Sequence, residues 1–223
     1  MEFQDARQQR LQQVIDEGYG FRLGQYINKG FEIFGKNAGA FIGFTFVYFI
    51  IVGLSGLIPF GSLIVAPPLS AGFFLVARKV NKGEQTEFND FFKGFEFFGP
   101  LVIASILTTI FIVIGTILLI LPGIFLGVAL AFVAPIIIFS GMEFWPAIQT
   151  SMSLIKKDWF AFFGFFILLG LINILGFLLL GVGLLVTIPA TYCAIYAAYE
   201  DIVGTDVNAN SQNSYDEFST TDY

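Results

Sequence analysis

The chain offers very few side chains that could carry out chemistry. Of its 223 residues none is a histidine, and one, Cys193, is a cysteine. This composition excludes acid–base catalysis by histidine, a Cys–His nucleophile, a disulfide within the chain and a His- or Cys-rich metal site. Cys193 lies in an apolar stretch, which favours packing over reactivity. We therefore expect no catalytic residue, no bound cofactor and no metal.

The acidic residues nearest to apolar stretches all lie between those stretches. They are Glu32, Glu96, Glu143 and Asp158. Ionisable residues inside a membrane helix are the usual sign of transport, proton relay or voltage sensing, and the apolar stretches contain none. Asn173 is the one strongly polar amide in such a stretch, and an amide in hydrocarbon needs a hydrogen-bond partner. We expect Asn173 to join two helices; a ligand site is the alternative.

The elements that must position these residues are membrane helices. Hydrophobic residues make up 56% of the chain and charged residues only 13%, about half the share of a soluble domain. The mean hydropathy is +0.79. A soluble fold of this size could not cover so much apolar surface, whereas a bilayer removes the need to. The composition predicts an all-α, polytopic membrane protein.

Six apolar stretches have about the 20 residues that a helix needs to cross the hydrocarbon layer. They lie at about 39–58, 61–78, 99–120, 123–140, 159–179 and 181–199. The stretches come in pairs joined by turns rich in Pro and Gly, which end one helix and permit a reversal. We place these turns at Pro59, Pro122 and Gly181. The pattern predicts six transmembrane helices arranged as three hairpins.

Prolines and glycines within the stretches indicate kinks and close helix contacts. Pro68, Pro135 and Pro189 lie in the second arms of the hairpins, where each removes a backbone donor. Small residues four apart permit close approach of helices. The candidate packing residues are Gly39, Gly43, Gly123, Gly127 and Gly164.

Three connecting segments mix aromatic with charged residues. Residues 22–37, 86–98 and 143–158 suit amphipathic helices that lie at the level of the lipid headgroups. Trp145 and Trp159 are the expected interfacial anchors. Ordinary loops with apolar residues tucked into the bundle are the alternative.

The distribution of charge predicts the topology. All eleven Lys and Arg residues lie outside the hairpins or at their open ends, so the positive-inside rule places both termini in the cytoplasm. Residues 1–24 read as a cytoplasmic helix without the features of a cleavable signal, and 25–204 as the membrane domain. Residues 205–223 form an acidic tail that we expect to be disordered. The tail and the amphipathic face could meet a membrane-protein or soluble partner; no basic patch points to nucleic acid.

The chain also contains an internal repeat. When the sequence is displaced by 121 residues, chemically distinct residues coincide without gaps. Examples are Lys36 with Lys157, Gly43 with Gly164, and Pro68 with Pro189. The segment Lys93-Gly94-Phe95-Glu96 repeats Lys29-Gly30-Phe31-Glu32. The repeated unit is an amphipathic helix followed by a hairpin, used three times in parallel orientation.

Some of these segments resemble a known family. They are residues 119–125 (LILPGIF), 132–135 (FVAP), 145–147 (WPA) and 181–189 (GVGLLVTIP). Together they resemble the membrane domain fused to some glycerophosphodiester phosphodiesterases and its uncharacterised, stand-alone bacterial relatives, over roughly 25–205. The resemblance implies a six-helix domain in the bacterial cytoplasmic (inner) membrane. It does not imply the phosphodiesterase activity, which belongs to a separate domain.

Two functions fit these observations. The first is a non-catalytic scaffold or accessory subunit that binds lipids or other membrane proteins. The second is a transporter or channel for a neutral or lipidic solute. A bundle core filled with Phe and Leu would favour the first, and a cavity lined by Thr, Ser, Tyr and Asn the second. Remodelling of lipid by hairpins that never cross the membrane is a further alternative.

Overall fold

The computed structural model describes residues 2–118 and 120–204, and every regular element in these ranges is a helix. The expected all-α class is thus confirmed. The elements are α1 (Glu2–Glu17), α2 (Leu23–Lys36), α3 (Ala38–Ser55), α4 (Gly61–Asn81), the 3₁₀ segment η1 (Phe88–Phe97), α5 (Phe98–Leu118), α6 (Ile120–Ala129), α7 (Val133–Ser140), α8 (Phe144–Lys156), α9 (Trp159–Leu178) and α10 (Leu184–Ile202). The tail predicted for 205–223 lies outside the described residues.

Five helical segments are long and apolar enough to cross a membrane. They are Ala38–Ser55, Gly61–Asn81, Phe88–Ile117, Pro122–Ser140 and Trp159–Leu178. The stretch expected at 181–199, now α10, is not among them. Its tyrosines and threonines, together with Glu200 and Asp201 at its end, lower its hydropathy. The protein itself buries much of α10, from Pro189 to Tyr199.

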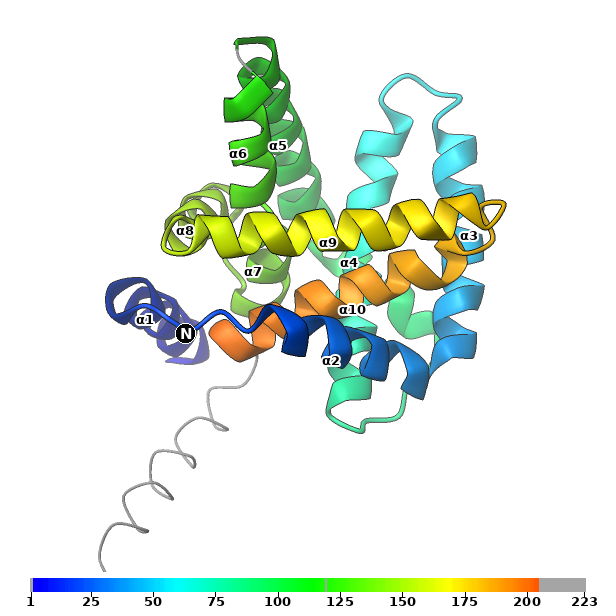
Figure 1. Cartoon of the computed structure of the whole chain (residues 1–223), viewed down its shortest axis with the longest axis horizontal. Coiled ribbons are helices and arrows are strands. Elements are labelled where there is room, and N and C mark those ends of the chain that lie inside the picture. The colour runs from blue at the N-terminus through cyan, green and yellow to red at the C-terminus, as the bar shows by residue number, and fades with distance from the viewer. Residues whose placement is uncertain (1, 119, 205–223) are drawn as a thin grey trace, which may run out of the picture.

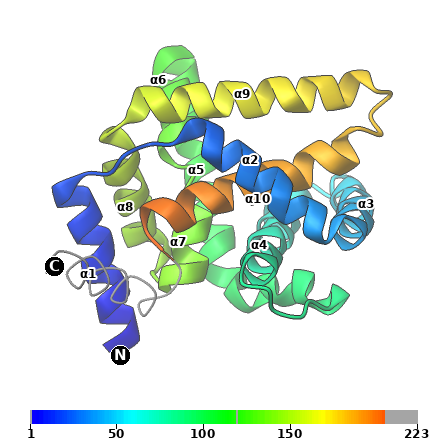
Figure 2. The ribbon, with the colours of Figure 1, turned by 60° about the horizontal axis from the view of Figure 1, so that its bottom comes forward.

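The hairpins do not stand parallel to one another. In Figure 1 the α3–α4 and α5–α6 hairpins rise side by side, whereas α9 and α10 run across them. The view in Figure 2, turned about the horizontal axis, keeps α9 and α10 horizontal. The sequence carries no signal for this crossing, because it arises from contacts between hairpins.

The first and third turns form apolar tips. Pro59 lies between the end of α3 and the start of α4, and Gly181 lies between α9 and α10. Phe60 and Leu180 adopt left-handed backbone conformations, with φ of 63° and 56°. Their side chains are 75% and 96% exposed. Bulky apolar residues in this strained backbone region are uncommon, and water would be a poor environment for them.

The second hairpin departs from the expected positions. Helix α6 already begins at Ile120, so Pro122 lies in its first turn and not at the reversal. Proline is tolerated there because the first N–H groups of a helix have no partner within it. The second arm is also broken, not merely kinked, near Pro135. Helix α6 ends at Ala129 and α7 begins at Val133, two residues before that proline.

Close helix contacts involve mostly other glycines than those expected. A Cβ added to Gly123 would collide with Thr116 across the α5–α6 pair. At Gly39 and Gly127 an added Cβ would meet nothing within 4 Å, so the expected packing role is wrong for these two. Gly43 and Gly164 make only ordinary contacts, 3.8 Å from Phe88 and 3.9 Å from Leu23. Spacing alone identifies small residues, but not which face meets another helix. Besides Gly123, close approaches to other residues occur at Gly30, Gly61, Gly72, Gly94, Gly176 and Gly183.

Each connecting segment packs on the second arm of a different hairpin. Helix α2 lies on α10, η1 on α4, and α8 on α7. A Cβ at Gly30 would stand 2.6 Å from the Ala194 backbone, and one at Gly94 would collide with the Pro68 carbonyl. In α8 the buried Ser151 hydroxyl donates to the Ala129 carbonyl over 2.8 Å. A small residue thus lies at all three junctions.

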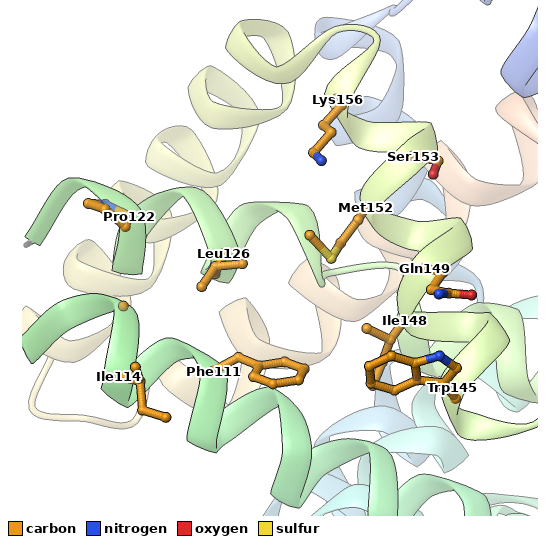
Figure 3. A pocket seen from close by; sticks show the side chains of 11 residues that line it. Phe111, Ile114, Pro122, Leu126, Trp145, Ile148, Gln149, Met152, Ser153 and Lys156 are labelled. Atoms are coloured by element: carbon orange, nitrogen blue, oxygen red, sulfur yellow. The ribbon is translucent and has the colours of Figure 1, made fainter. Parts of the chain in front are cut away.

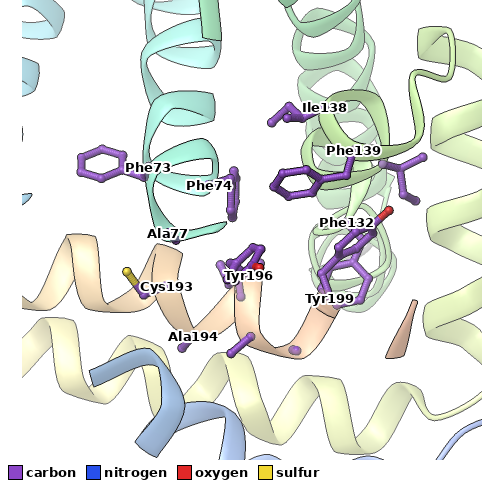
Figure 4. Packing of buried hydrophobic residues seen from close by; sticks show 14 of the residues in the cluster. Phe73, Phe74, Ala77, Phe132, Ile138, Phe139, Cys193, Ala194, Tyr196 and Tyr199 are labelled. Carbon is purple, nitrogen blue, oxygen red and sulfur yellow. The ribbon is translucent and has the colours of Figure 1, made fainter. Parts of the chain in front are cut away.

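The core lies where these second arms meet and is largely aromatic. Figure 4 shows Phe74 of α4 facing Phe139 of α7, with Tyr196 of α10 beside them, while Phe73 points to the other side of α4. The Ser140 and Tyr199 hydroxyls lie 3.0 Å apart within it. The hairpin tips extend outward from this core.

Candidate functional site

A groove of about 830 Å³ lies between the α5–α6 pair and α8. Figure 3 shows α5 and α6 on one side and α8 on the other, with Met152 and Lys156 extending towards α6. The lining residues are Phe111, Ile114, Gly115, Pro122, Leu126, Trp145, Ile148, Gln149, Met152, Ser153 and Lys156. The groove therefore joins residues that are up to 45 positions apart, from Phe111 to Lys156.

Helix α8 has two distinct faces. The residues buried in the bundle include Ala147, Ser151 and Leu154. The groove face carries Trp145, Gln149, Met152, Ser153 and Lys156. These positions repeat at three or four residues, which places them in one stripe of an α-helix. The stripe faces the groove because the opposite stripe is committed to packing.

The opposite wall is narrow because α5 and α6 approach closely. Gly123 rests on Thr116, and a Cβ at Gly115 would come within 3.0 Å of Leu126. The Phe111 ring meets the Trp145 indole edge-on, with centroids 6.5 Å apart. This contact closes one end of the groove.

The polar groups of the groove all come from α8. Gln149, Ser153 and Lys156 face it, whereas the α5 and α6 residues are apolar or glycine. Lys156 is the only charged residue among the described lining. An apolar trough with a few convergent polar groups is the general form of a small-molecule or lipid site.

The two expected interfacial anchors differ in their surroundings. Trp145 is 47% exposed and lines the groove. Trp159 packs against protein instead, because its ring stacks on Phe163 at 4.9 Å and on Phe125 at 5.6 Å. Its indole N–H is buried without a partner in the structure.

The structure places Asn173 between two helices. Its amide donates to the Leu169 carbonyl over 2.9 Å and to the Thr191 hydroxyl of α10 over 2.8 Å. Thr191 in turn donates to the Thr187 carbonyl. Asn173 therefore links the two helices of the third hairpin, α9 and α10. Neither Asn173 nor Pro189 lines the groove.

A smaller cavity of about 350 Å³ lies among the hairpins. Its polar lining consists of hydroxyl groups from Ser70, Ser105, Thr108 and Tyr192, and no charged residue lines it. The Tyr192 hydroxyl donates to Ser70 over 3.1 Å. Pro67 and Gly127 also border this cavity.

A polar cluster joins the start of α2 to the end of α10 at the base of the bundle. Arg22 forms an ion pair with Asp201, and the Tyr26 hydroxyl donates to the same carboxylate over 2.7 Å. Burial, aided by this hydrogen bond, raises the pKa of Tyr26 to about 12. A hollow of about 440 Å³ adjoins the cluster. A second cluster centres on Asp90, which is buried and paired with Lys79 and Lys93 at 2.9 and 2.7 Å.

Sequence reasoning identified Trp145 and Pro122 but not the groove that brings them together. The stripe on α8 was the available signal, since Gln149, Ser153 and Lys156 follow Trp145 at helical spacing. Which hairpin the stripe faces could not be read from it. Within the described residues no three His, Cys, Asp or Glu side chains gather to hold a metal ion.

No family model, curated protein or solved structure matches the chain. The resemblance noted from residues 119–125 and 181–189 therefore stays an expectation.

Proposed function

We propose that the protein is a non-catalytic scaffold or accessory subunit of the bacterial cytoplasmic membrane that binds membrane lipid in the groove beside α8. The observation that carries the proposal is the groove itself. Its apolar wall on α5 and α6 suits an acyl chain, and its polar stripe on α8 suits a headgroup. The buried Phe and Tyr residues at the centre of the bundle support a scaffold.

The proposal includes three hairpin units related by an internal repeat. Corresponding helices have matching first residues: α2 and α8 begin at residues 23 and 144, and α3 and α9 at 38 and 159. Both pairs differ by 121 positions, the displacement found in the sequence. The residues preceding α3 and α9 also share a backbone conformation, with φ and ψ of −144° and 43° at Asn37 and −138° and 51° at Asp158.

The proposed orientation has the bases of the hairpins at the cytoplasmic surface and the tips in or across the lipid. Charged clusters at Arg22 and Asp90 lie at the bases, whereas Leu57, Phe60 and Leu180 at the tips are exposed and apolar. In this orientation α2, η1 and α8 lie at headgroup level, and both termini are cytoplasmic. Because α9 and α10 run across the other hairpins, this orientation does not specify how deep the third hairpin lies in the membrane.

Purification of the full chain in mild detergent, followed by mass spectrometry of retained lipids and proteins, tests the function. We expect phospholipid to be retained, and retention to fall when Ile114→Phe and Leu126→Phe together fill the groove. Ile110→Phe is the matched control, because Ile110 is 45% exposed on α5 but does not line the groove. Equal retention by the filled variant and the control would contradict the proposal.

A second candidate function is passage of a neutral solute, favoured by the hydroxyl-lined cavity at Ser70 and Tyr192. Uptake of small neutral solutes into proteoliposomes tests it. Transport that Ser70→Val abolishes would support this candidate over the scaffold.

A further inference from the structure

The groove separates polar from apolar lining in a way that orients an amphiphile. Every polar side chain comes from α8, at the base of the α5–α6 hairpin, and the trough then runs along Phe111 and Ile114 towards Pro122. A ligand with a polar head and a long apolar chain fits only with its head at α8. This direction agrees with a lipid whose headgroup lies at the base and whose chain follows the hairpin.

The charge of the groove is positive at one end. Lys156 is exposed and lines the groove, and α9 begins three residues later at Trp159. Asp158, which follows Lys156 by two residues and precedes α9, does not line the groove, so Lys156 sets the charge of the described lining. The acid closest to the other end is Glu143, at the N-terminus of α8. It lies thirteen residues before Lys156, which is roughly 20 Å along a helix and beyond the screening length at physiological salt.

The same lining disfavours a zwitterionic headgroup. A choline or ethanolamine ammonium would need a carboxylate or an open aromatic face beside the phosphate site. No acidic residue is present among the described lining, and Trp145 lies eleven residues from Lys156, roughly 16 Å along α8. Trp145 is moreover engaged with Phe111. One headgroup cannot reach both Lys156 and Trp145.

Resting on the proposed lipid-binding function, we propose that the groove selects an anionic glycerophospholipid. Its phosphate contacts the Lys156 ammonium, with Ser153 and Gln149 as further hydrogen-bonding groups. One acyl chain lies against Phe111, Ile114 and Leu126. Lys156 is thus a specificity-determining residue for the net charge of the headgroup.

The two tryptophans permit a direct measurement. In a Trp159→Phe background Trp145 alone reports on the groove. The protein is reconstituted into vesicles that contain either phosphatidylglycerol or phosphatidylcholine with brominated acyl chains, each over the same range of mole fractions. We expect brominated phosphatidylglycerol to quench Trp145 at about fivefold lower mole fraction, the preference that one lysine gives at an anionic surface.

Paired variants separate the possible results. Lys156→Gln should remove the preference and Lys156→Arg should keep it. Lys157→Gln is the matched control, since Lys157 is the next residue along the chain and does not line the groove. Equal quenching by both lipids in the parent, or equal loss in Lys156→Gln and Lys157→Gln, would overturn the anionic selectivity while leaving lipid binding intact. Quenching that Ile114→Phe with Leu126→Phe leaves unchanged would instead overturn the groove as a lipid site.

Discussion

The hydroxyl group of Ser105 in α5 shares its hydrogen between the carbonyl oxygen of Leu63 in α4 and that of Val102 in its own helix, each at 3.2 Å. In an unbroken helix the Leu63 carbonyl would accept the N–H of the residue four positions later, which here is Pro67. Proline has no N–H, so the carbonyl is left free. Within lipid such a group must find a partner from a neighbouring helix. The first and second hairpins are therefore joined where a proline interrupts the first.

This relationship predicts a coupled pair of substitutions. Ser105→Ala should destabilise the protein by about 1–3 kcal/mol, because it leaves the Leu63 carbonyl without a donor. Pro67→Ala restores a backbone N–H, so Ser105→Ala should cost much less in that background. Thermal unfolding of the wild type, the two single variants and the double variant in detergent measures the coupling between Ser105 and Pro67. Additive effects would show that Ser105 does not compensate for the proline.

The junction between α2 and α10 should be intolerant of any side chain at Gly30. A Cβ there would approach backbone atoms of Ala194 to 2.6 Å, and a backbone cannot move aside cheaply. We expect Gly30→Ala to lower the melting temperature markedly. Gly35→Ala lies in the same helix with no atom within 4 Å of the added Cβ and should be neutral or slightly stabilising. Equal behaviour of the two variants would argue against the junction.

Alkaline pH should weaken the contact between α2 and the end of α10. The pKa of Tyr26 is raised to about 12 by burial and by its hydrogen bond to Asp201, against an ordinary value of about 10. A raised pKa stabilises the folded state below about pH 10, and this contribution is lost as the pH rises towards 12. Melting curves between these pH values should fall less steeply for Tyr26→Phe than for the wild type. Parallel slopes would contradict this assignment.

The tips provide a test of topology. Cys193 is buried, so single cysteines introduced elsewhere can be read against a silent background. Leu57→Cys and Ile117→Cys, exposed near the tips of the two hairpins that rise side by side, should react with an impermeant thiol reagent from outside the cell. Lys82→Cys at the base should react only after permeabilisation. Labelling of Lys82→Cys from outside would refute the orientation. Silence at both tips would mean that the hairpins enter the lipid without crossing it.

Substitution of Phe60 at the first tip should separate the effect of its backbone strain on stability from the effect of its side chain on membrane anchoring. Phe60 holds a left-handed backbone that glycine adopts without cost. Phe60→Gly should therefore raise the melting temperature in detergent, because a non-glycine residue in this region costs of the order of 1 kcal/mol. Leu57→Gly removes a similarly exposed apolar side chain without relieving positive φ and should not stabilise. A lower melting temperature for Phe60→Gly would show that its side chain contributes to folding.

Local patterns in the sequence predict the helices well but not their mutual arrangement. The hairpin turn at Pro59 follows from adjacent residues, since proline and glycine act on the backbone next to them. The turn predicted at Pro122 lies too far along the sequence, because proline is compatible with both a reversal and the first turn of a helix. Stretch 181–199 matches the others in length and apolar character, yet its tyrosines Tyr196 and Tyr199 are buried in the protein core.

The groove could not be predicted from the sequence for a related reason. The stripe from Trp145 to Lys156 can be read from helical spacing, but its partner wall on α5 and α6 depends on how α8 turns back on the second hairpin. Glycines illustrate the same limit. Gly30 and Gly94 stand in the repeated Lys-Gly-Phe-Glu segment and mark tight junctions, whereas the regularly spaced Gly39 does not.

The contact between Gly30 and Ala194 has a consequence for biosynthesis. Helix α2 leaves the ribosome well before its partner α10, because α2 ends at Lys36 and α10 begins only at Leu184. At typical rates of translation the intervening residues take on the order of ten seconds to appear. During that interval the apolar face of α2 has no native partner and must rest on the membrane or on a chaperone. The junction between α2 and α10 forms only after α10 has been synthesised, so truncations that remove α10 should leave the first hairpin inserted but exposed to proteolysis.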